Sequence, residues 1–360
     1  MKKILFIAVH RPFRSPSQRF RFDQYMEFFQ QNGYEITYSS LISESDDVWF
    51  YKPGHMIKKI WLIVKSIFIR INDVSRASKF DYVFVQREAI MLGTSWFERQ
   101  FAKKSILVYD FDDSIWLLDV SAANKGFGWL KRPQKTAEII QASSLVFAGN
   151  EYLANYARTF NSQVLVVPTV LKTADINYTY SEKIVNDPLV IGWIGSTTTI
   201  KHIEWAQPIL KRVLDDFFGK VKLVVVADKK PLLNDIDFEF RVWSPEVEKQ
   251  LLTSMDIGIM PLPDDEWTRG KCGFKGLQCM SYGIPVVMSA VGVNTQIISH
   301  GENGFLANDI TDWTEMLKQL IQEPWLRTSM GEKGRSTVVN SYSLEYWQKM
   351  VVIEFQKLKR

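Results

Sequence analysis

The sequence predicts an α/β protein with two doubly wound parallel-sheet domains of similar size, and three observations support this prediction. The chain has 360 residues, the usual length of two domains. Short apolar runs bounded by turn residues alternate with longer amphipathic segments, the pattern of a parallel sheet covered by helices. A polar stretch in the middle interrupts this alternation, which then restarts. We therefore expect two Rossmann-like domains whose loops face a cleft between them.

The expected strands form two sets of five on either side of the polar stretch. The first set is Ile4–Val9, Tyr82–Gln86, Ile106–Tyr109, Leu145–Ala148 and Val164–Val167. The second set is Leu189–Ile194, Lys222–Ala227, Glu239–Trp243, Ile257–Pro261 and Pro285–Ser289. The polar stretch, Lys172–Pro188, is rich in Thr, Asn, Asp and Ser. The predicted boundaries are a first domain over 1–171, a linker over 172–188 and a second domain over 189–341.

Composition excludes several classes of protein. Forty-four Lys and Arg against 40 Asp and Glu leave a net charge of +4, too small an excess to indicate nucleic-acid binding. The two cysteines, Cys272 and Cys279, fall in one predicted helix, so they form neither a disulfide scaffold nor a metal knot. The apolar run near the N-terminus is six residues long and no run reaches 18, which predicts neither a signal peptide nor a membrane span. A cytoplasmic location fits best.

The segment 57–71 is an amphipathic helix with two interpretations. Its apolar residues recur at helical spacing: Ile57, Ile60, Trp61, Val64, Ile67, Phe68 and Ile71. A stripe of this kind usually packs against the core of its own domain. However, further apolar residues widen the face, lysines and an arginine are interspersed, and aromatic residues precede it. Such a helix can also make peripheral contact with the inner membrane surface, and the sequence leaves both interpretations open.

A basic, glycine-containing segment in the second half could hold a diphosphate. Arg269, Lys271 and Lys275 alternate with glycines where a helix is expected to begin. Glycines permit close approach of the backbone, and the first N–H groups of a helix favour an anion. The alternative is a surface loop with solvated basic side chains.

The second half of the sequence, which contains this segment, resembles the family 4 retaining nucleotide-sugar glycosyltransferases (glycosyltransferase group 1), which have the GT-B fold. The motifs that carry the resemblance are Gly283-Ile284-Pro285-Val286-Val287, Val291-Gly292-Val293-Asn294 and Gly301-Glu302-Asn303-Gly304-Phe305-Leu306. The resemblance covers about Leu189 to Ser341 and implies transfer of a sugar, with retention, from a nucleotide-diphosphate-sugar donor to a saccharide or lipid-linked acceptor. It also implies a role in cell-surface polysaccharide biosynthesis, no metal and no further cofactor.

The resemblance places the donor on the second domain. The implied donor-binding residues are Gly195, Ser196, Thr197, Lys201, Trp243, Asp265, Lys275, Gln278, Val293 and Asn294. The chain departs from the family at three points: Ser196 stands where an Arg is common, and Gln278 and Gly270 stand where the family has two Glu residues. A neutral amide accepts weaker hydrogen bonds than a carboxylate. The role of the earlier Glu could pass to Asp264, Asp265 or Glu266, of which Asp265 is preferred.

The first domain supplies the predicted acceptor side. Its residues are His10, Arg14, Ser17, Arg19 and Arg21, in the loop after the first strand, and Asn150. The cations of this loop could grip phosphates of the donor or of a lipid-diphosphate acceptor. A surface loop with salt-bridged arginines is an equal alternative. The terminal segment 342–360 has the pattern of an amphipathic helix, and the resemblance implies that it packs back onto the first domain.

Asp112 and Asp113 follow a strand and are predicted to be catalytic together with Lys271 and Arg269. Where many relatives have a His, these carboxylates could orient the acceptor hydroxyl or accept its proton. The alternative is that Asp113 caps a helix beginning at Ser114. Arg269, Lys271 and Lys275 would stabilise the leaving diphosphate.

Two other functions remain open. A nucleotide-sugar epimerase of the same fold would use the same donor pocket without an acceptor. A degenerate, non-catalytic member would bind a saccharide or a partner protein and no nucleotide. The nucleotide, sugar, acceptor, linkage and oligomeric state are not specified by the sequence.

Overall fold

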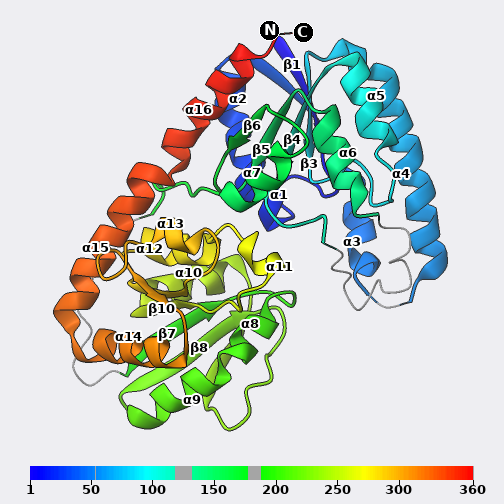
Figure 1. The fold of residues 1–360 in the computed structure, drawn as a ribbon. Helices are drawn as coiled ribbons and strands as arrows, with labels where there is room; N and C mark the ends of the chain where they lie inside the picture. Colours follow the sequence, from blue (N-terminus) through cyan, green and yellow to red (C-terminus); the bar gives the residue numbers. More distant parts are fainter. Residues whose placement is uncertain (53, 118–131, 177–187, 360) are drawn as a thin grey trace. The chain divides into compact units, whose positions relative to one another are not determined.

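The computed structural model describes residues 1–52, 54–117, 132–176 and 188–359, and the chain divides into two compact units (Figure 1). Unit 1 comprises residues 1–169, 270–272 and 347–360, and unit 2 comprises residues 170–269 and 273–346. Each unit contains one six-stranded sheet. The predicted α/β class with two parallel sheets is confirmed. Residues 177–187 of the predicted linker lie outside the described residues.

The sheet of unit 1 has the strand order β2-β1-β3-β4-β5-β6, and all neighbouring strands are parallel. Its strands are β1 (Lys2–Ile7), β2 (Tyr34–Ser39), β3 (Tyr82–Gln86), β4 (Ile106–Phe111), β5 (Leu145–Ala148) and β6 (Val164–Val166). Every residue of β3, β4 and β5 is buried, which explains why their sequences are continuous apolar runs. Because the strands are parallel, their carboxyl ends share one edge of the sheet.

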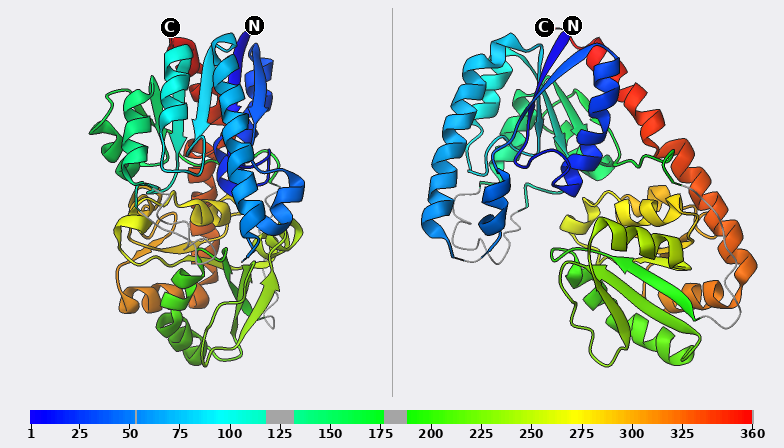
Figure 2. Two further views of the ribbon diagram at one scale, coloured as in Figure 1. Left: turned by 90° about the vertical axis from the view of Figure 1, so that its right-hand side faces the viewer. Right: turned by 180° about the vertical axis from the view of Figure 1, so that it is seen from behind.

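Helices cover both faces of this sheet (Figure 2). They are α1 (Pro16–Arg21), η1 (Asp23–Tyr25), α2 (Met26–Gln31), α3 (Glu44–Phe50), α4 (Met56–Arg76), η2 (Ala77–Lys79), α5 (Trp96–Lys104), α6 (Gln134–Ala142), α7 (Glu151–Arg158) and α16 (Leu344–Lys357). In the ribbon views α4 and α5 lie on one side of the sheet, and α2 and α16 lie on the other.

Unit 2 repeats this plan with the strand order β12-β11-β10-β7-β8-β9, again all parallel. Its strands are β7 (Leu189–Ile194), β8 (Val221–Ala227), β9 (Phe238–Val242), β10 (Ile257–Met260), β11 (Val286–Ser289) and β12 (Phe305–Ala307). Its helices are α8 (Ile200–Trp205), α9 (Gln207–Asp216), α10 (Pro245–Ser254), α11 (Glu266–Arg269), α12 (Phe274–Ser281), α13 (Asn294–Ile297), α14 (Ile310–Gln322) and α15 (Pro324–Ser341).

All ten predicted strands are present, with ends that differ by at most two residues. The apolar pattern does not reveal β2 and β12. Strand β2 is at the sheet edge and only partly buried, so it lacks a continuous apolar run. Strand β12 is three residues long. The expectation that both cysteines lie in one helix was wrong, because Cys272 precedes α12 and only Cys279 is within it.

The C-terminal helix α16 inserts one aromatic side chain into the core of unit 1. Phe355 is completely buried. The rings within 6.4 Å of its own, measured between centroids, belong to Phe29, Tyr34, Tyr82, Phe84 and Phe147. In addition, the Tyr82 hydroxyl donates a hydrogen bond to the Phe355 carbonyl oxygen at 3.0 Å. The end of the chain thus belongs to unit 1 and contributes Phe355 to its core.

We predict that Phe355→Ala lowers the free energy of unfolding of unit 1 by about 3–5 kcal/mol, because it leaves a cavity among aromatic rings. Chemical denaturation followed by circular dichroism measures this loss. Ile353→Ala is the matched control in the same helix, since Ile353 is 43% exposed. An equal effect of both substitutions would contradict the packing role of Phe355.

Candidate functional site

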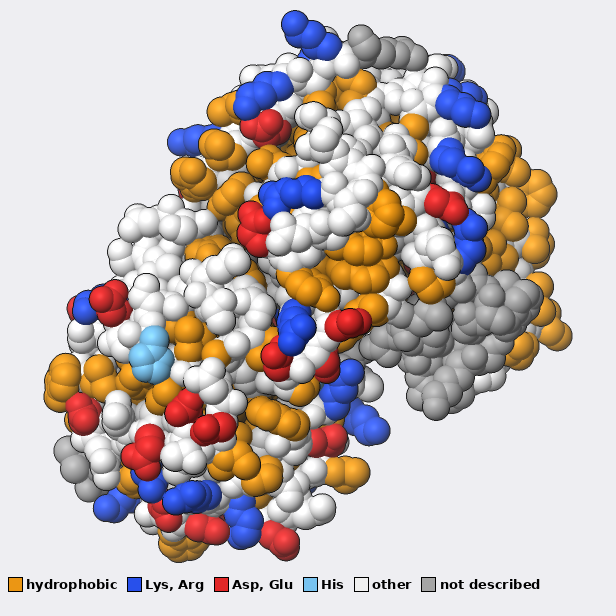
Figure 3. All heavy atoms as spheres, viewed as in Figure 1, with side chains coloured by type: hydrophobic (Ala, Val, Ile, Leu, Met, Phe, Trp, Pro, Cys, Tyr) orange, Lys and Arg blue, Asp and Glu red, His pale blue; other side chains and the backbone are white. Residues whose placement is uncertain are grey.

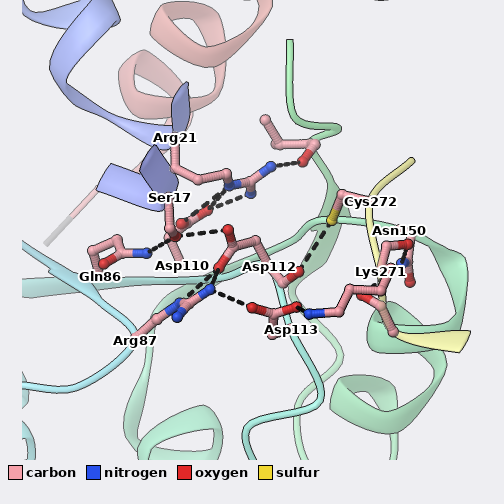
Figure 4. Close-up of polar contacts among 12 residues, drawn as sticks. Ser17, Arg21, Gln86, Arg87, Asp110, Asp112, Asp113, Asn150, Lys271 and Cys272 are labelled. Carbon is pink, nitrogen blue, oxygen red and sulfur yellow. Dashed lines mark hydrogen bonds and ion pairs between the residues drawn. The ribbon is translucent and has the colours of Figure 1, made fainter. Parts of the chain in front are cut away.

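Polar side chains from four segments meet at the carboxyl edge of the unit 1 sheet (Figure 4). The Ser17 hydroxyl, in α1, donates to Oδ2 of Asp112 at 2.6 Å. The side-chain amide of Gln86, the last residue of β3, donates to the Ser17 oxygen at 2.7 Å. Asp112 directly follows β4. The parallel topology thus brings together residues that are up to 95 positions apart in the chain.

Arg87 is at the centre of this group. Its guanidinium contacts Oδ1 of Asp112 at 2.8 Å and also pairs with Asp113. The Arg87 backbone has φ of 61°, the left-handed region that non-glycine residues rarely adopt. Two hydrogen bonds of 2.8 Å hold it there: its N–H donates to the Asp110 carbonyl, and its carbonyl accepts from the Tyr109 hydroxyl. An observed outlier of this kind is typical of a functional position.

Residues 270–272 join the same network. Lys271 Nζ pairs with Oδ1 of Asp113 at 2.8 Å, and the Cys272 thiol donates to the backbone carbonyl of Asp112 at 3.1 Å. Burial raises the pKa of the Cys272 thiol to about 12, so it is protonated at neutral pH. Arg87, which pairs with both Asp112 and Asp113, and Lys271, which pairs with Asp113, balance the negative charges of the two aspartates.

Asn150 and Gly270 allow residues 270–272 to pack against the loops that follow β4 and β5. The Asn150 amide group donates to the carbonyls of Gly270 at 3.1 Å and Lys271 at 2.9 Å, while its oxygen caps α7. A Cβ at residue 270 would lie 2.1 Å from the Ser114 hydroxyl oxygen and 3.0 Å from the Ser114 backbone nitrogen. The backbone here therefore has no room for the Glu that the family has at this position.

The electrostatics define what the two aspartates can do. Burial alone would raise the pKa of Asp112, but Arg87, Arg21 and the Ser17 hydrogen bond outweigh it and hold the pKa below its usual range. Asp112 is therefore ionised at neutral pH and is a weak proton acceptor. Residues 115 and 116 form a turn, so the structure gives no support to Asp113 as a helix cap.

The predicted acceptor residues are placed differently from one another. Arg21 is buried and pairs with Asp110, so it joins α1 to β4 and is not presented to a ligand. Arg14 pairs with Asp47 of α3 at 2.9 Å and is about half exposed. The Arg19 guanidinium lies 4.4 Å from the centre of the Phe20 ring. The interpretation of a surface loop with salt-bridged arginines is thus correct for Arg14, whereas Arg21 lies in α1 and forms a buried pair.

His10 has an unusual environment in the same loop. Its Nε2 hydrogen-bonds the Tyr51 hydroxyl at 2.9 Å. Burial, to which the charges of Arg14, Arg87 and Arg11 add, lowers the pKa of His10 to about 4 against the opposing effect of Asp47. The imidazole is therefore neutral at physiological pH.

In unit 2, predicted donor residues gather in the loop after β7. A Cβ at Gly195 would collide with the Trp193 ring at 1.9 Å, so only glycine fits. The Ser196 N–H donates to the Thr199 hydroxyl at 2.9 Å, and the Thr197 hydroxyl donates to Asp228 at 2.8 Å. Lys201, in α8, is exposed.

Lys275 joins α12 to this loop. Its Nζ is 3.0 Å from the Thr199 hydroxyl oxygen and 5.1 Å from the centre of the Trp193 ring. By contrast, Arg269 pairs with the carboxylate of Asp264 at 2.7 Å. The three cations that the sequence groups together therefore have three different environments.

A carboxylate that the sequence pattern did not indicate lies beside Gln278. Glu248 of α10 accepts hydrogen bonds of 2.6 Å from the Gln278 amide and from the Trp243 indole N–H. Trp243 is therefore partly exposed and oriented by a charge, rather than a core residue. Ser244 caps α10 and so sets Glu248 in the first turn of that helix, but only the fold shows that Glu248 faces α12.

The other predicted donor residues have local roles as well. Asp265 accepts a hydrogen bond from the Thr268 N–H at 2.7 Å at the start of α11. Val293 and Asn294 begin α13, and the Asn294 amide group donates to the Ser289 carbonyl at 2.9 Å. The Asn294 oxygen is buried and has no hydrogen-bond partner within the part of the chain that the structure describes. Among the described residues, no group of three His, Cys, Asp or Glu side chains is arranged to hold a metal.

Comparison with protein families gives a match to glycosyl transferases group 1 over residues 188–323. Two relatives are a capsular polysaccharide biosynthesis glycosyltransferase of Staphylococcus aureus, CapM, and the N-acetyl-alpha-D-glucosaminyl L-malate synthase of Bacillus anthracis. Both are 23% identical; the match covers 47% of this chain and 46% of CapM, and 57% of this chain and 58% of the synthase. The chain thus spans about half the length of the curated relatives it matches.

Solved structures resemble the whole chain. Sucrose-phosphate synthase of Thermosynechococcus elongatus has a TM-score of 0.73 at 13% identity, with 99% of each chain covered. Anabaena HepE in complex with UDP-glucose has a TM-score of 0.68 at 13% identity, with 99% of this chain and all of HepE covered. These likenesses confirm the expected GT-B fold.

We predict that the stability of the chain depends on pH through His10. Above about pH 6.5 its imidazole is neutral in the folded and unfolded chain. As the pH falls from 6.5 to about 4, the unfolded chain binds a proton that the folded chain does not, so stability is lost over this range. Denaturant unfolding near pH 7 and near pH 5 should show a smaller loss for His10→Gln than for the wild type. His55→Asn, at an exposed histidine, is the control, and equal losses for His10→Gln and the wild type would refute the prediction.

Proposed function

We propose, from the match of residues 188–323 to glycosyl transferases group 1, that this chain transfers a sugar from a nucleoside-diphosphate sugar to a hydroxyl of a saccharide or lipid-linked acceptor. The match over most of unit 2 is the observation that carries the proposal. Retention of anomeric configuration follows from the family resemblance. The name of the S. aureus relative favours a pathway of cell-surface polysaccharide synthesis.

We assign the donor to the carboxyl edge of the unit 2 sheet. Lys275 is the cation that we assign to the leaving diphosphate, because its Nζ lies beside the Thr199 hydroxyl in the loop after β7 and near the Trp193 ring. Negative charge develops on the leaving diphosphate during transfer, so a fixed cation there lowers the barrier. Because HepE, which has a similar fold, was solved with UDP-glucose bound, UDP is the first nucleotide to test.

We assign recognition of the nucleoside to Glu248, Gln278 and Trp243. The family resemblance implies a Glu at the position of Gln278, and here Glu248 supplies a carboxylate 2.6 Å from the Gln278 amide. An ionised carboxylate accepts stronger hydrogen bonds from ribose hydroxyls than a neutral amide does. The indole ring of Trp243, oriented by Glu248, offers a surface on which a base can stack.

We assign the acceptor to the carboxyl edge of the unit 1 sheet. The ionised carboxylate of Asp112 can orient an acceptor hydroxyl, and Arg87 and Lys271 hold the two aspartates in place. In this proposal Lys271 is a positioning residue, since its charge is matched by Asp113. A lipid-linked acceptor would bring the enzyme to the inner face of a membrane.

We predict that Lys275→Ala weakens the binding of a nucleoside diphosphate at least about tenfold, because it removes a cation from the phosphates. Calorimetry with UDP, GDP, ADP and dTDP identifies the nucleotide in the wild type and measures the loss in the variant. Lys222→Ala is the matched control, since Lys222 is exposed near the amino end of β8.

The wild-type protein, incubated with the sugar derivative of the nucleotide that it binds, distinguishes sugar transfer from epimerisation and from a non-catalytic role. Release of nucleoside diphosphate that depends on a saccharide acceptor supports transfer. Conversion of the donor sugar without any acceptor would indicate an epimerase. A wild type that binds none of the four nucleotides would overturn the proposed function.

A further inference from the structure

Helix α4 exposes a stripe of apolar side chains to solvent, while Leu62 and Val74 are buried in the core together with several polar residues of the same helix. Ile57, Trp61 and Phe68 are 84%, 66% and 67% exposed. The complete exposed stripe, which we call the α4 stripe, consists of Met56, Ile57, Ile60, Trp61, Val64, Phe68 and Ile71. The interpretation of segment 57–71 as a stripe packed on the core is therefore wrong for six of the seven predicted residues, and only Ile67 packs against the core. A covering helix normally has the opposite arrangement.

The buried polar residues explain this orientation. Arg70 is completely buried, and its guanidinium donates to the carbonyls of Ala8 and Ala89 and pairs with Asp73 at 2.8 Å. Lys59, Ser66, Arg70 and Asp73 are buried on one face of α4, because successive members of this set are seven, four and three residues apart. Rotating α4 to bury its apolar stripe would expose these groups and leave the carbonyls without their donor. The outward apolar face is thus fixed by the fold.

Exposed lysines border the stripe at both ends. Residues 52–79 contain seven Lys or Arg and one Asp, but Arg70 and Arg76 pair with Asp73, Lys65 pairs with Asp46, and Lys59 is buried. Lys52 and Lys58 are exposed near one end of the stripe, and Lys79 is exposed beyond the other. Figure 3 shows apolar side chains gathered along the edge of unit 1 that α4 occupies. An exposed apolar stripe bordered by lysines favours a binding partner whose surface is apolar and carries anionic groups.

We propose that the α4 stripe binds the surface of an anionic lipid bilayer. The apolar side chains would enter the boundary between headgroups and acyl chains, and the lysines would contact lipid phosphates. Pairing with a second copy through the same face would bring the exposed lysines of the two copies, Lys52, Lys58 and Lys79, close to one another, which is unfavourable. Among the described residues, no helix is long and apolar enough to cross a membrane.

The stripe adjoins the proposed acceptor loop. Arg11 and Arg14, which follow β1, both pair with Asp47 of α3, and α3 precedes α4 in the chain. His10 contacts Tyr51, directly after α3. A bilayer on the α4 stripe would therefore be continuous with the part of unit 1 to which we assign the acceptor. The binding itself rests on α4 alone and does not require the proposed reaction.

Flotation with vesicles tests the proposal on the full chain. Wild-type protein is expected to float with vesicles of phosphatidylcholine containing about one third phosphatidylglycerol, and less with phosphatidylcholine alone. Trp61→Gln/Phe68→Gln should reduce the bound fraction more than about tenfold, and Lys52→Glu/Lys58→Glu should weaken binding to the anionic vesicles. Phe218→Gln/Trp325→Gln removes equally exposed apolar residues from unit 2, 90% and 67% exposed, and should bind as the wild type does.

Three results would overturn the proposal. The first is a wild type that does not float at low salt, and the second is a Trp61→Gln/Phe68→Gln variant that floats as well as the wild type. The third is a wild type that does not bind vesicles but sediments as a dimer that this double substitution dissociates, which would assign the stripe to a second copy. Equal melting temperatures of all variants exclude unfolding as the cause. Vesicle binding without sugar transfer would keep this inference and refute the proposed function.

Discussion

Charged groups buried in unit 1 have to be paired, and this constraint organises both the candidate site and the surface of the unit. An ion that loses its partner inside a protein is strongly destabilising. Arg21 and Asp110 satisfy this constraint between α1 and β4, and Arg70 and Asp73 satisfy it within α4. Arg87 satisfies it at the carboxyl edge of the sheet, where it holds Asp112 and Asp113.

The need to pair buried charges has different consequences at the carboxyl edge of the unit 1 sheet and on α4. At the sheet edge it keeps Asp112 ionised and makes Lys271 a partner of Asp113, so that we assign Lys271 a positioning role rather than contact with the diphosphate. On α4 it fixes the polar face inward and so leaves the apolar stripe exposed. In unit 2, the cation assigned to the diphosphate, Lys275, contacts Thr199 and the Trp193 ring.

The sequence predicted the architecture well because buried parallel strands are continuous apolar runs. The edge strand β2 escaped this pattern, since only part of it is buried. The partners of the site residues could not be predicted, because Ser17 and Asp112, or Gln278 and Glu248, are far apart in the chain and meet only through the sheet topology. Helical spacing located α4 but could not tell which face is inside. That was decided by Arg70, whose acceptors are carbonyls of distant loops.

The central claim is that the donor nucleotide binds at the carboxyl edge of the unit 2 sheet. A crystal structure of the chain with UDP, or with the nucleotide that calorimetry selects, tests it most directly. We expect the diphosphate beside Lys275 and the loop 195–199, and the ribose hydroxyls beside Glu248. A nucleotide held instead by Arg11 and Arg14 of unit 1, with Lys275 and Glu248 making no contact, would contradict the account.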